Sequence, residues 1–141
     1  MSSNVITCRN CQTRNRVPAV ASGTPTCGSC KQPLAWIAAA DDTNFDRVAD
    51  SSKQLVLVDL WAPWCGPCRQ VTPVLEQIAN DNAGKLKLVK VNVDNAPHSA
   101  RRFDARSIPT LVLLRNGKQV GRQIGAQPAG TLRKWVASQL G

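Results

Sequence analysis

The sequence is poor in aromatic residues and has no long apolar stretch. Its 141 residues include no tyrosine, two phenylalanines and four tryptophans, and none of these lies in residues 1–33. That segment therefore lacks the aromatic platform on which single-stranded nucleic acids stack. No window approaches the roughly 20 apolar residues that a membrane-spanning helix needs. We therefore expect no membrane insertion and no nucleic-acid partner.

An export signal is also missing. The N-terminal residues MSSNVITCRNCQTRNR contain no apolar signal core, so we expect a cytoplasmic protein. Six cysteines are present nevertheless. In a chain without an export signal, cysteines favour metal binding or redox catalysis over structural disulfides.

Acidic residues are absent from residues 1–40, which carry Arg9, Arg14, Arg16 and Lys31. Such a basic, cysteine-containing arm could contact nucleic acid. The interpretation that we favour is local charge compensation, because a zinc ion bound by four thiolates has a net negative charge.

Four of the cysteines lie in this arm as two pairs. Cys8, Cys11, Cys27 and Cys30 are spaced C-x2-C-x15-C-x2-C, which is within the range of four-cysteine zinc sites. Two disulfides, free thiols or an iron ion are the alternatives. Few apolar residues are available here for a core, so a metal ion would supply the folding energy. We therefore predict a zinc-binding module over residues 1–33 that holds one structural ion.

A regular pattern of apolar residues begins at residue 34. It predicts strands over residues 34–40, 55–62 and 87–94, and two strands within 109–125 that are joined by Asn116–Gly117, a typical hairpin-turn dipeptide. It predicts helices over 41–51, from 65 to about 84, over 96–105 and over 130–140. Early strands joined by helices and late strands joined by a tight turn indicate an α/β domain with a mixed sheet.

The remaining cysteines form the motif CGPC between an apolar strand and an amphipathic helix. The first turn of a helix has unpaired N–H groups and the positive end of the helix dipole. A thiolate is stabilised there, so we expect a lowered pKa and nucleophilic reactivity for Cys65. Proline is tolerated at position 67 because an N–H group in the first turn of a helix has no partner in the helix to lose. Cys68 lies one turn from Cys65, where it could attack a mixed disulfide formed at Cys65.

Asp59 interrupts the apolar run LVLVDLWA just before this motif. Burial of an unpaired carboxylate is costly, so its pKa should rise. The alternative is an edge strand on which Asp59 faces water. The nearby CxxC favours a proton-transfer role.

Several motifs in the same order resemble the thioredoxin family. They are VDLWAPWCGPC (58–68), Pro73, SIPTLVLLRNGK (107–118) and IGA (124–126). The resemblance covers about residues 34–141 and implies the thioredoxin fold, a central mixed sheet flanked by helices. It also implies a thiol–disulfide oxidoreductase that reduces protein disulfides.

The resemblance further implies roles for individual residues. Cys65 would attack the target disulfide, Cys68 would resolve the mixed disulfide, and Asp59 would help to move the proton of Cys68. The substrate-binding surface around the sulfurs would comprise Trp64, Gly66, Pro67, the cis-proline pair Ile108 and Pro109, and Gly125.

With its four-cysteine arm, the whole chain resembles the zinc-containing class of bacterial thioredoxins. This implies disulfide-containing protein substrates and re-reduction by an NADPH-dependent thioredoxin reductase, with no bound organic cofactor; we expect a monomer. Two alternatives stay open: a zinc-ribbon binding module on a passive scaffold, and a zinc-based oxidant sensor.

Overall fold

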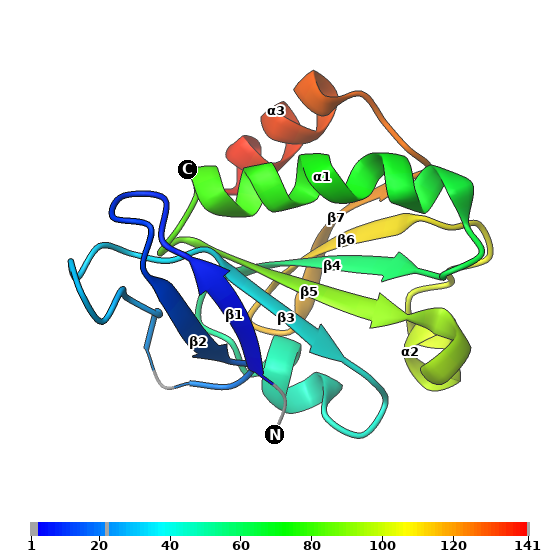
Figure 1. The fold of residues 1–141 in the computed structure, drawn as a ribbon. Helices are drawn as coiled ribbons and strands as arrows, with labels where there is room; N and C mark the ends of the chain where they lie inside the picture. Colours follow the sequence, from blue (N-terminus) through cyan, green and yellow to red (C-terminus); the bar gives the residue numbers. More distant parts are fainter. Residues whose placement is uncertain (1–2, 22, 141) are drawn as a thin grey trace.

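The computed structural model describes residues 3–21 and 23–140, and its centre is a five-stranded mixed sheet (Figure 1). The strand order is β3-β5-β4-β6-β7, with β3, β5 and β4 parallel and β6 and β7 antiparallel to their neighbours. The strands are β3 (Trp36–Ala40), β4 (Leu55–Trp61), β5 (Leu86–Asn92), β6 (Thr110–Arg115) and β7 (Lys118–Ile124). The mixed sheet predicted from the sequence is confirmed.

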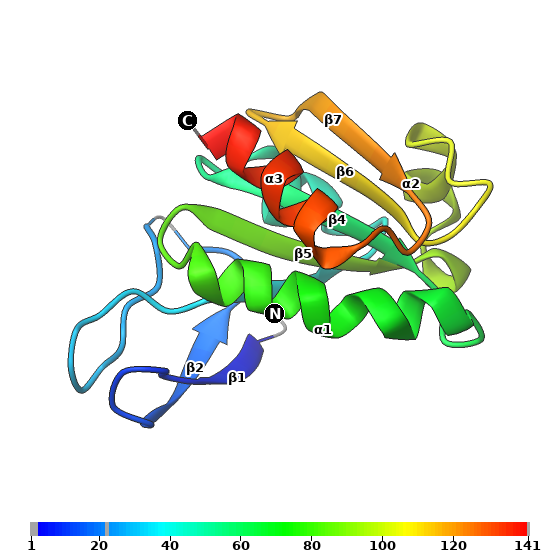
Figure 2. The ribbon, with the colours of Figure 1, turned by 90° about the horizontal axis from the view of Figure 1, so that it is seen from above.

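Helices cover both faces of this sheet. They are η1 (Asp46–Asp50), α1 (Gly66–Asp81), η2 (Val93–Asn95), α2 (Pro97–Arg102) and α3 (Ala129–Leu140). Helices α1 and α3 lie over one face, and η1 and α2 lie on the other (Figures 1 and 2). No helix of residues 3–21 and 23–140 is long and apolar enough to cross a membrane.

Strand β4 lies in the middle of the sheet and separates two apolar cores. Val56, Val58 and Leu60 pack on the η1 face, whereas Leu55 and Leu57 pack beneath α1 and α3. The near-continuous apolar run is explained by this position, because a strand covered on both faces buries every side chain.

Glycines with positive φ angles form part of two turns. Asn116 and Gly117 have φ angles of 53° and 78° and connect β6 to β7, as expected for a hairpin turn that needs two positive φ angles. Gly84 has a φ of 86° just after α1, at the C-terminal stop predicted for this helix.

The predicted helices over residues 41–51 and 96–105 are shorter than expected. The first is the five-residue π-helical turn η1, and the second is the six-residue α2. The segment before η1 instead forms a turn in which Asp41 Oδ1 accepts hydrogen bonds from the main chain and hydroxyl of Thr43. After α2, Asp104 has a φ of 50°, which ends the helix.

The N-terminal arm contains a β-hairpin that the sequence pattern did not predict. Strands β1 (Ser3–Thr7) and β2 (Arg14–Pro18) pair antiparallel beside the main sheet. Buried Val17 packs against Leu34 and Trp36 in a small core that also contains cysteine sulfurs. Leu34 and Trp36, which follow the arm in sequence, thus supply the largest apolar side chains of its core. The sequence of residues 1–33 alone therefore looks too polar to form one.

Candidate active site and metal centre

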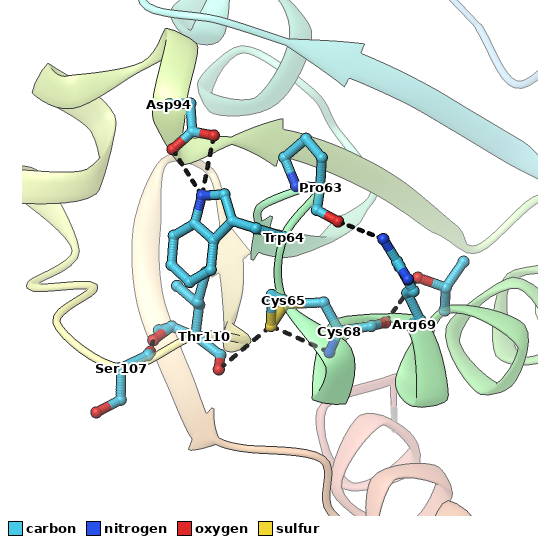
Figure 3. Close-up of a disulfide and its surroundings, with 10 residues drawn as sticks. Pro63, Trp64, Cys65, Cys68, Arg69, Asp94, Ser107 and Thr110 are labelled. Carbon is cyan, nitrogen blue, oxygen red and sulfur yellow. Dashed lines mark hydrogen bonds between the residues drawn. A yellow bond between two sulfur atoms is a disulfide. The ribbon is translucent and has the colours of Figure 1, made fainter.

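Cys65 and Cys68 form a disulfide at the start of α1, with their Cα atoms 5.3 Å apart (Figure 3). Cys65 precedes the helix in an extended conformation, and its Sγ accepts a hydrogen bond of 3.2 Å from the main-chain N–H of Cys68. Only 4% of Cys65 is exposed. A thiolate at this sulfur would therefore receive an N–H donor and the positive end of the helix dipole.

The loop before β6 lies at the same end of the sheet as this disulfide, and the loop after β7 is hydrogen-bonded to that loop. The Ile108–Pro109 peptide is cis, and the carbonyl oxygen of Ile108 lies 3.6 Å from Cys65 Sγ. Gly125 N–H donates to the carbonyl of Pro109 at 2.8 Å, with a φ of 85° that favours glycine. Of these three predicted binding residues, Ile108 thus contacts the sulfur, and Gly125 is joined to the neighbouring Pro109.

Trp64 is the most exposed large apolar side chain of the described residues, with 69% of it accessible. Its indole Nε1–H donates to both carboxylate oxygens of Asp94, at 3.1 and 3.2 Å (Figure 3). Asp94 lies in η2, directly after β5, and the sequence reasoning missed it. No local pattern pairs it with Trp64, since the two residues are 30 positions apart. Gly66 and Pro67 lie beside Trp64 in the first turn of α1.

Asp59 lies in the central strand β4 and is completely buried. Neither carboxylate oxygen has a hydrogen-bond partner among the described residues. Burial raises the pKa of Asp59 from 3.8 to about 6, and the positive charge of Lys90 partly opposes this rise. The alternative of a water-facing carboxylate on an edge strand is therefore wrong.

Lys90 is a second residue that the sequence reasoning missed. It is the register partner of Asp59 on the neighbouring strand β5, and its Nζ lies 5.3 Å from the ring centroid of Trp61. One feature of the sequence could have identified it: Lys90 lies inside the apolar run KLVKVNV, and a charged residue among buried ones needs a partner.

The four remaining cysteines converge at the other end of α1. Their sulfur atoms all lie within 4.8 Å of one another, with 3.6 Å between Cys8 and Cys30 and also between Cys11 and Cys27. A zinc ion with four Zn–S bonds of about 2.3 Å in tetrahedral geometry would separate the sulfurs by about 3.8 Å. The donor set therefore fits such an ion.

The two cysteine pairs of this cluster have matching turns. Gln12 N–H donates to the carbonyl of Cys8, and Lys31 N–H donates to the carbonyl of Cys27. Gln12 and Lys31 both have a φ of 67°. These turns direct main-chain N–H groups at the sulfurs of Cys8 and Cys27. Such hydrogen bonds, that of Cys30 foremost, lower the pKa of Cys27 to about 6, whereas at Cys8 burial and the neighbouring sulfurs outweigh them and raise the pKa. A thiol that ionises readily is a better metal ligand.

The arm contacts the end of α1 that is opposite the disulfide (Figure 1). Arg9 donates to the carbonyl of Asn80 at 2.8 Å and lies 3.4 Å from a carboxylate oxygen of Asp81. A helix of 16 residues spans about 24 Å. The two sulfur clusters are therefore too far apart for direct thiol–disulfide exchange within this arrangement.

Residues 36–138 match the thioredoxin family. The chain belongs to this family. The thioredoxin of Haemophilus influenzae is 45% identical over 71% of this chain and 94% of its own length. Thioredoxin 1 of Nostoc sp. is also 45% identical, over 76% of this chain and all of its own length.

A chloroplastic M-type thioredoxin of Triticum aestivum is 39% identical over 79% of this chain, which spans only 64% of the length of that relative. Thioredoxins are protein-disulfide oxidoreductases, and the CGPC disulfide of this chain fits that chemistry. The family match begins at residue 36 and so leaves out the four-cysteine cluster.

Proposed function

We propose that this protein reduces disulfide bonds of other proteins through the CGPC dithiol. The observation that carries the proposal is the Cys65–Cys68 disulfide at the N-terminus of α1, directly beside the cis Ile108–Pro109 peptide. In this proposal residues 34–141 form the thioredoxin domain, and residues 1–33 form a four-cysteine zinc-binding module.

The reaction begins from the reduced dithiol. The thiolate of Cys65 attacks one sulfur of the target disulfide, a new S–S bond forms, and the other target sulfur leaves as a thiolate. Cys68 then attacks the sulfur of Cys65, which closes the Cys65–Cys68 disulfide and releases the second target thiol. Two electrons pass to the target, and the enzyme ends oxidised.

Asp59 accepts the proton of Cys68 in the second step, through a water molecule. Its pKa of about 6 supports this role, because a base titrating near the working pH takes and returns a proton with little energetic cost. In the ionised state Asp59 would be a buried carboxylate next to Lys90, which limits that cost.

The target peptide binds across the exposed surface around Cys65. Its extended main chain pairs with the loop of Ile108 and Pro109, while Trp64 and Gly125 flank the sulfur. Gly66 and Pro67 leave Cys65 accessible to a target, since neither has a long side chain that would cover the sulfur. A Cβ on Gly66 or Gly125 would meet no heavy atom within 4 Å, so both positions border open space.

An NADPH-dependent thioredoxin reductase returns the disulfide to the dithiol, and the protein acts as a cytoplasmic monomer. Cys8, Cys11, Cys27 and Cys30 hold one zinc ion, which supplies folding energy to the arm and takes no part in electron transfer.

A coupled assay tests the proposal: insulin disulfides, NADPH and a bacterial thioredoxin reductase, followed by NADPH consumption. We expect turnover by the unchanged protein and none by Cys65→Ser. Full turnover by Cys65→Ser would contradict the mechanism.

A further inference from the structure

A cavity of about 390 Å³ lies where the N-terminal arm meets the main sheet, and the residues that line it include neither the CGPC cysteines nor those of the four-cysteine cluster. Val20 and Thr24 of the arm form one wall, and Ser51, Ser52 and Gln54, which follow η1, form another. Its volume is in the range of about 300–1,000 Å³ that is typical of small-molecule sites.

Of the residues that the structure describes, three positive side chains and no carboxylate line this cavity. The positive side chains are Arg47, Lys53 and Lys87. Among the described residues, neither Arg47 nor Lys53 forms an ion pair. Asp50, the nearby acid at the end of η1, is already bound by Arg102 at 2.7 Å. The cavity thus concentrates positive charge that the protein does not neutralise.

Lys87 gives the cavity a fixed cation. It belongs to strand β5, is 1% exposed, and donates at 2.6 Å to the carbonyls of both Ala19 and Val48. Its Nζ lies 4.0 Å from the ring centroid of Trp36. A buried ammonium is costly unless it is compensated, and burial lowers the pKa of Lys87 to about 8. A bound anion would favour its charged form.

Hydroxyl and amide groups complete the lining. Thr24 and Ser51 supply hydroxyl groups and Gln54 supplies a side-chain amide, whereas the hydroxyl of Ser52 donates to Gln54 Oε1 at 2.8 Å. Hydroxyls and cations together suit a tetrahedral oxyanion, which accepts several hydrogen bonds and carries two charges near neutral pH.

We propose that this cavity binds a phosphate group, either as the free ion or as part of a small organic phosphate. The bound group would contact Arg47 and Lys53 at the mouth and lie over Lys87. Because the cavity walls come from both the arm and the main sheet, binding would also hold the two together and raise thermal stability by mass action.

The experiment is titration of the full chain with inorganic phosphate, monitored by calorimetry and by amide NMR shifts, against sodium chloride at matched ionic strength. A parallel titration uses ribose 5-phosphate. Tighter binding of ribose 5-phosphate identifies an organic phosphate as the ligand, and equal or weaker binding identifies the free ion. Saturable shifts in residues 20–24 and 51–54 are expected in either case.

The variant that tests the site is Arg47→Gln/Lys53→Gln, because both side chains are exposed and their loss leaves Lys87 and the cores in place. We expect phosphate affinity to fall at least about tenfold, since a hydrogen bond to a charged group is worth roughly that much. The control Lys118→Gln/Arg133→Gln removes the same charge from exposed positions elsewhere and should bind normally. Shifts no larger than with chloride, or equal losses in both variants, would overturn the proposal.

Discussion

The two sulfur clusters use the same C-x-x-C spacing but surround it differently. In CGPC the residue after the second cysteine, Arg69, continues into α1. In the two outer pairs the corresponding residues, Gln12 and Lys31, have a φ of 67° and close a tight turn. A helix leaves two sulfurs at its N-terminus near a binding surface, whereas two such turns direct four sulfurs at one point.

The comparison shows that the residues between the cysteines do not decide the chemistry. CGSC and CGPC differ by one letter, yet Cys27 lies among three other sulfurs and Cys65 lies beside a cis-proline loop. The backbone conformation after the second cysteine separates the two sites, because it decides whether the chain continues into a helix or turns so that its sulfurs join a four-sulfur cluster.

The largest expected effect that separates the clusters is the loss of Cys68. In Cys68→Ser, Cys65 should still attack a target disulfide, but no second sulfur remains to release it. We expect insulin reduction at background level and a protein–target adduct in the mass spectrum that dithiothreitol removes. Cys11→Ser, which removes one sulfur of the other cluster, should turn over at nearly the normal rate. A fast Cys68→Ser variant, or no adduct, would place the resolving thiol elsewhere.

The second expected effect is on the N-terminal arm. Removal of the proposed zinc ion by a strong chelator, or the change Cys27→Ser, should eliminate zinc from metal analysis and expose β1 and β2 to amide exchange. Metal binding in comparable four-ligand sites contributes on the order of 10 kcal/mol, and the arm has only a small core to replace it. The amides of β4 and β5 should stay protected. Loss of protection throughout the sheet would show that the two regions fold as one unit.

The third expected effect is a pH dependence that comes from Asp59. Its pKa is about 6 when folded and near 3.8 when unfolded. The unfolded chain therefore releases this proton first, and stability falls as the pH rises from about 4 to above 6. Each pKa unit is worth about 1.4 kcal/mol, so the loss is roughly 3 kcal/mol. Urea unfolding of Asp59→Asn between pH 4 and 8 should lack this component, and an identical pH profile would refute the assignment.

The thioredoxin-like part was largely predictable from local patterns. The apolar run of β4, the Asn116–Gly117 turn and the helix after Cys65 each depend on neighbouring residues, and each was found where the sequence indicated it. These signals are strong because burial, positive φ and helix starts constrain particular residue types at fixed spacing.

The rest depends on contacts between distant residues. The pairing of Trp64 with Asp94 and the anchoring of Lys87 by Ala19 and Val48 join positions that no period connects. The β1–β2 hairpin was missed for the same reason, since its core is completed by Leu34, which lies before β3, and by Trp36, the first residue of β3. The composition of such a segment therefore predicts less regular structure than it has.

The smallest expected effect concerns the contact between the regions. Arg9 donates to the Asn80 carbonyl at the C-terminal end of α1 and pairs with Asp81, but its side chain is 58% exposed. Exposed ion pairs contribute about 0.2–1 kcal/mol. Arg9→Gln should therefore lower the free energy of unfolding by less than about 1 kcal/mol, with insulin reduction unchanged, because this helix end lies about 24 Å from Cys65. The matched variant Arg14→Gln, on the exposed side of β2, should change neither. A measurable loss of turnover in Arg9→Gln alone would mean that the arm influences the dithiol through α1.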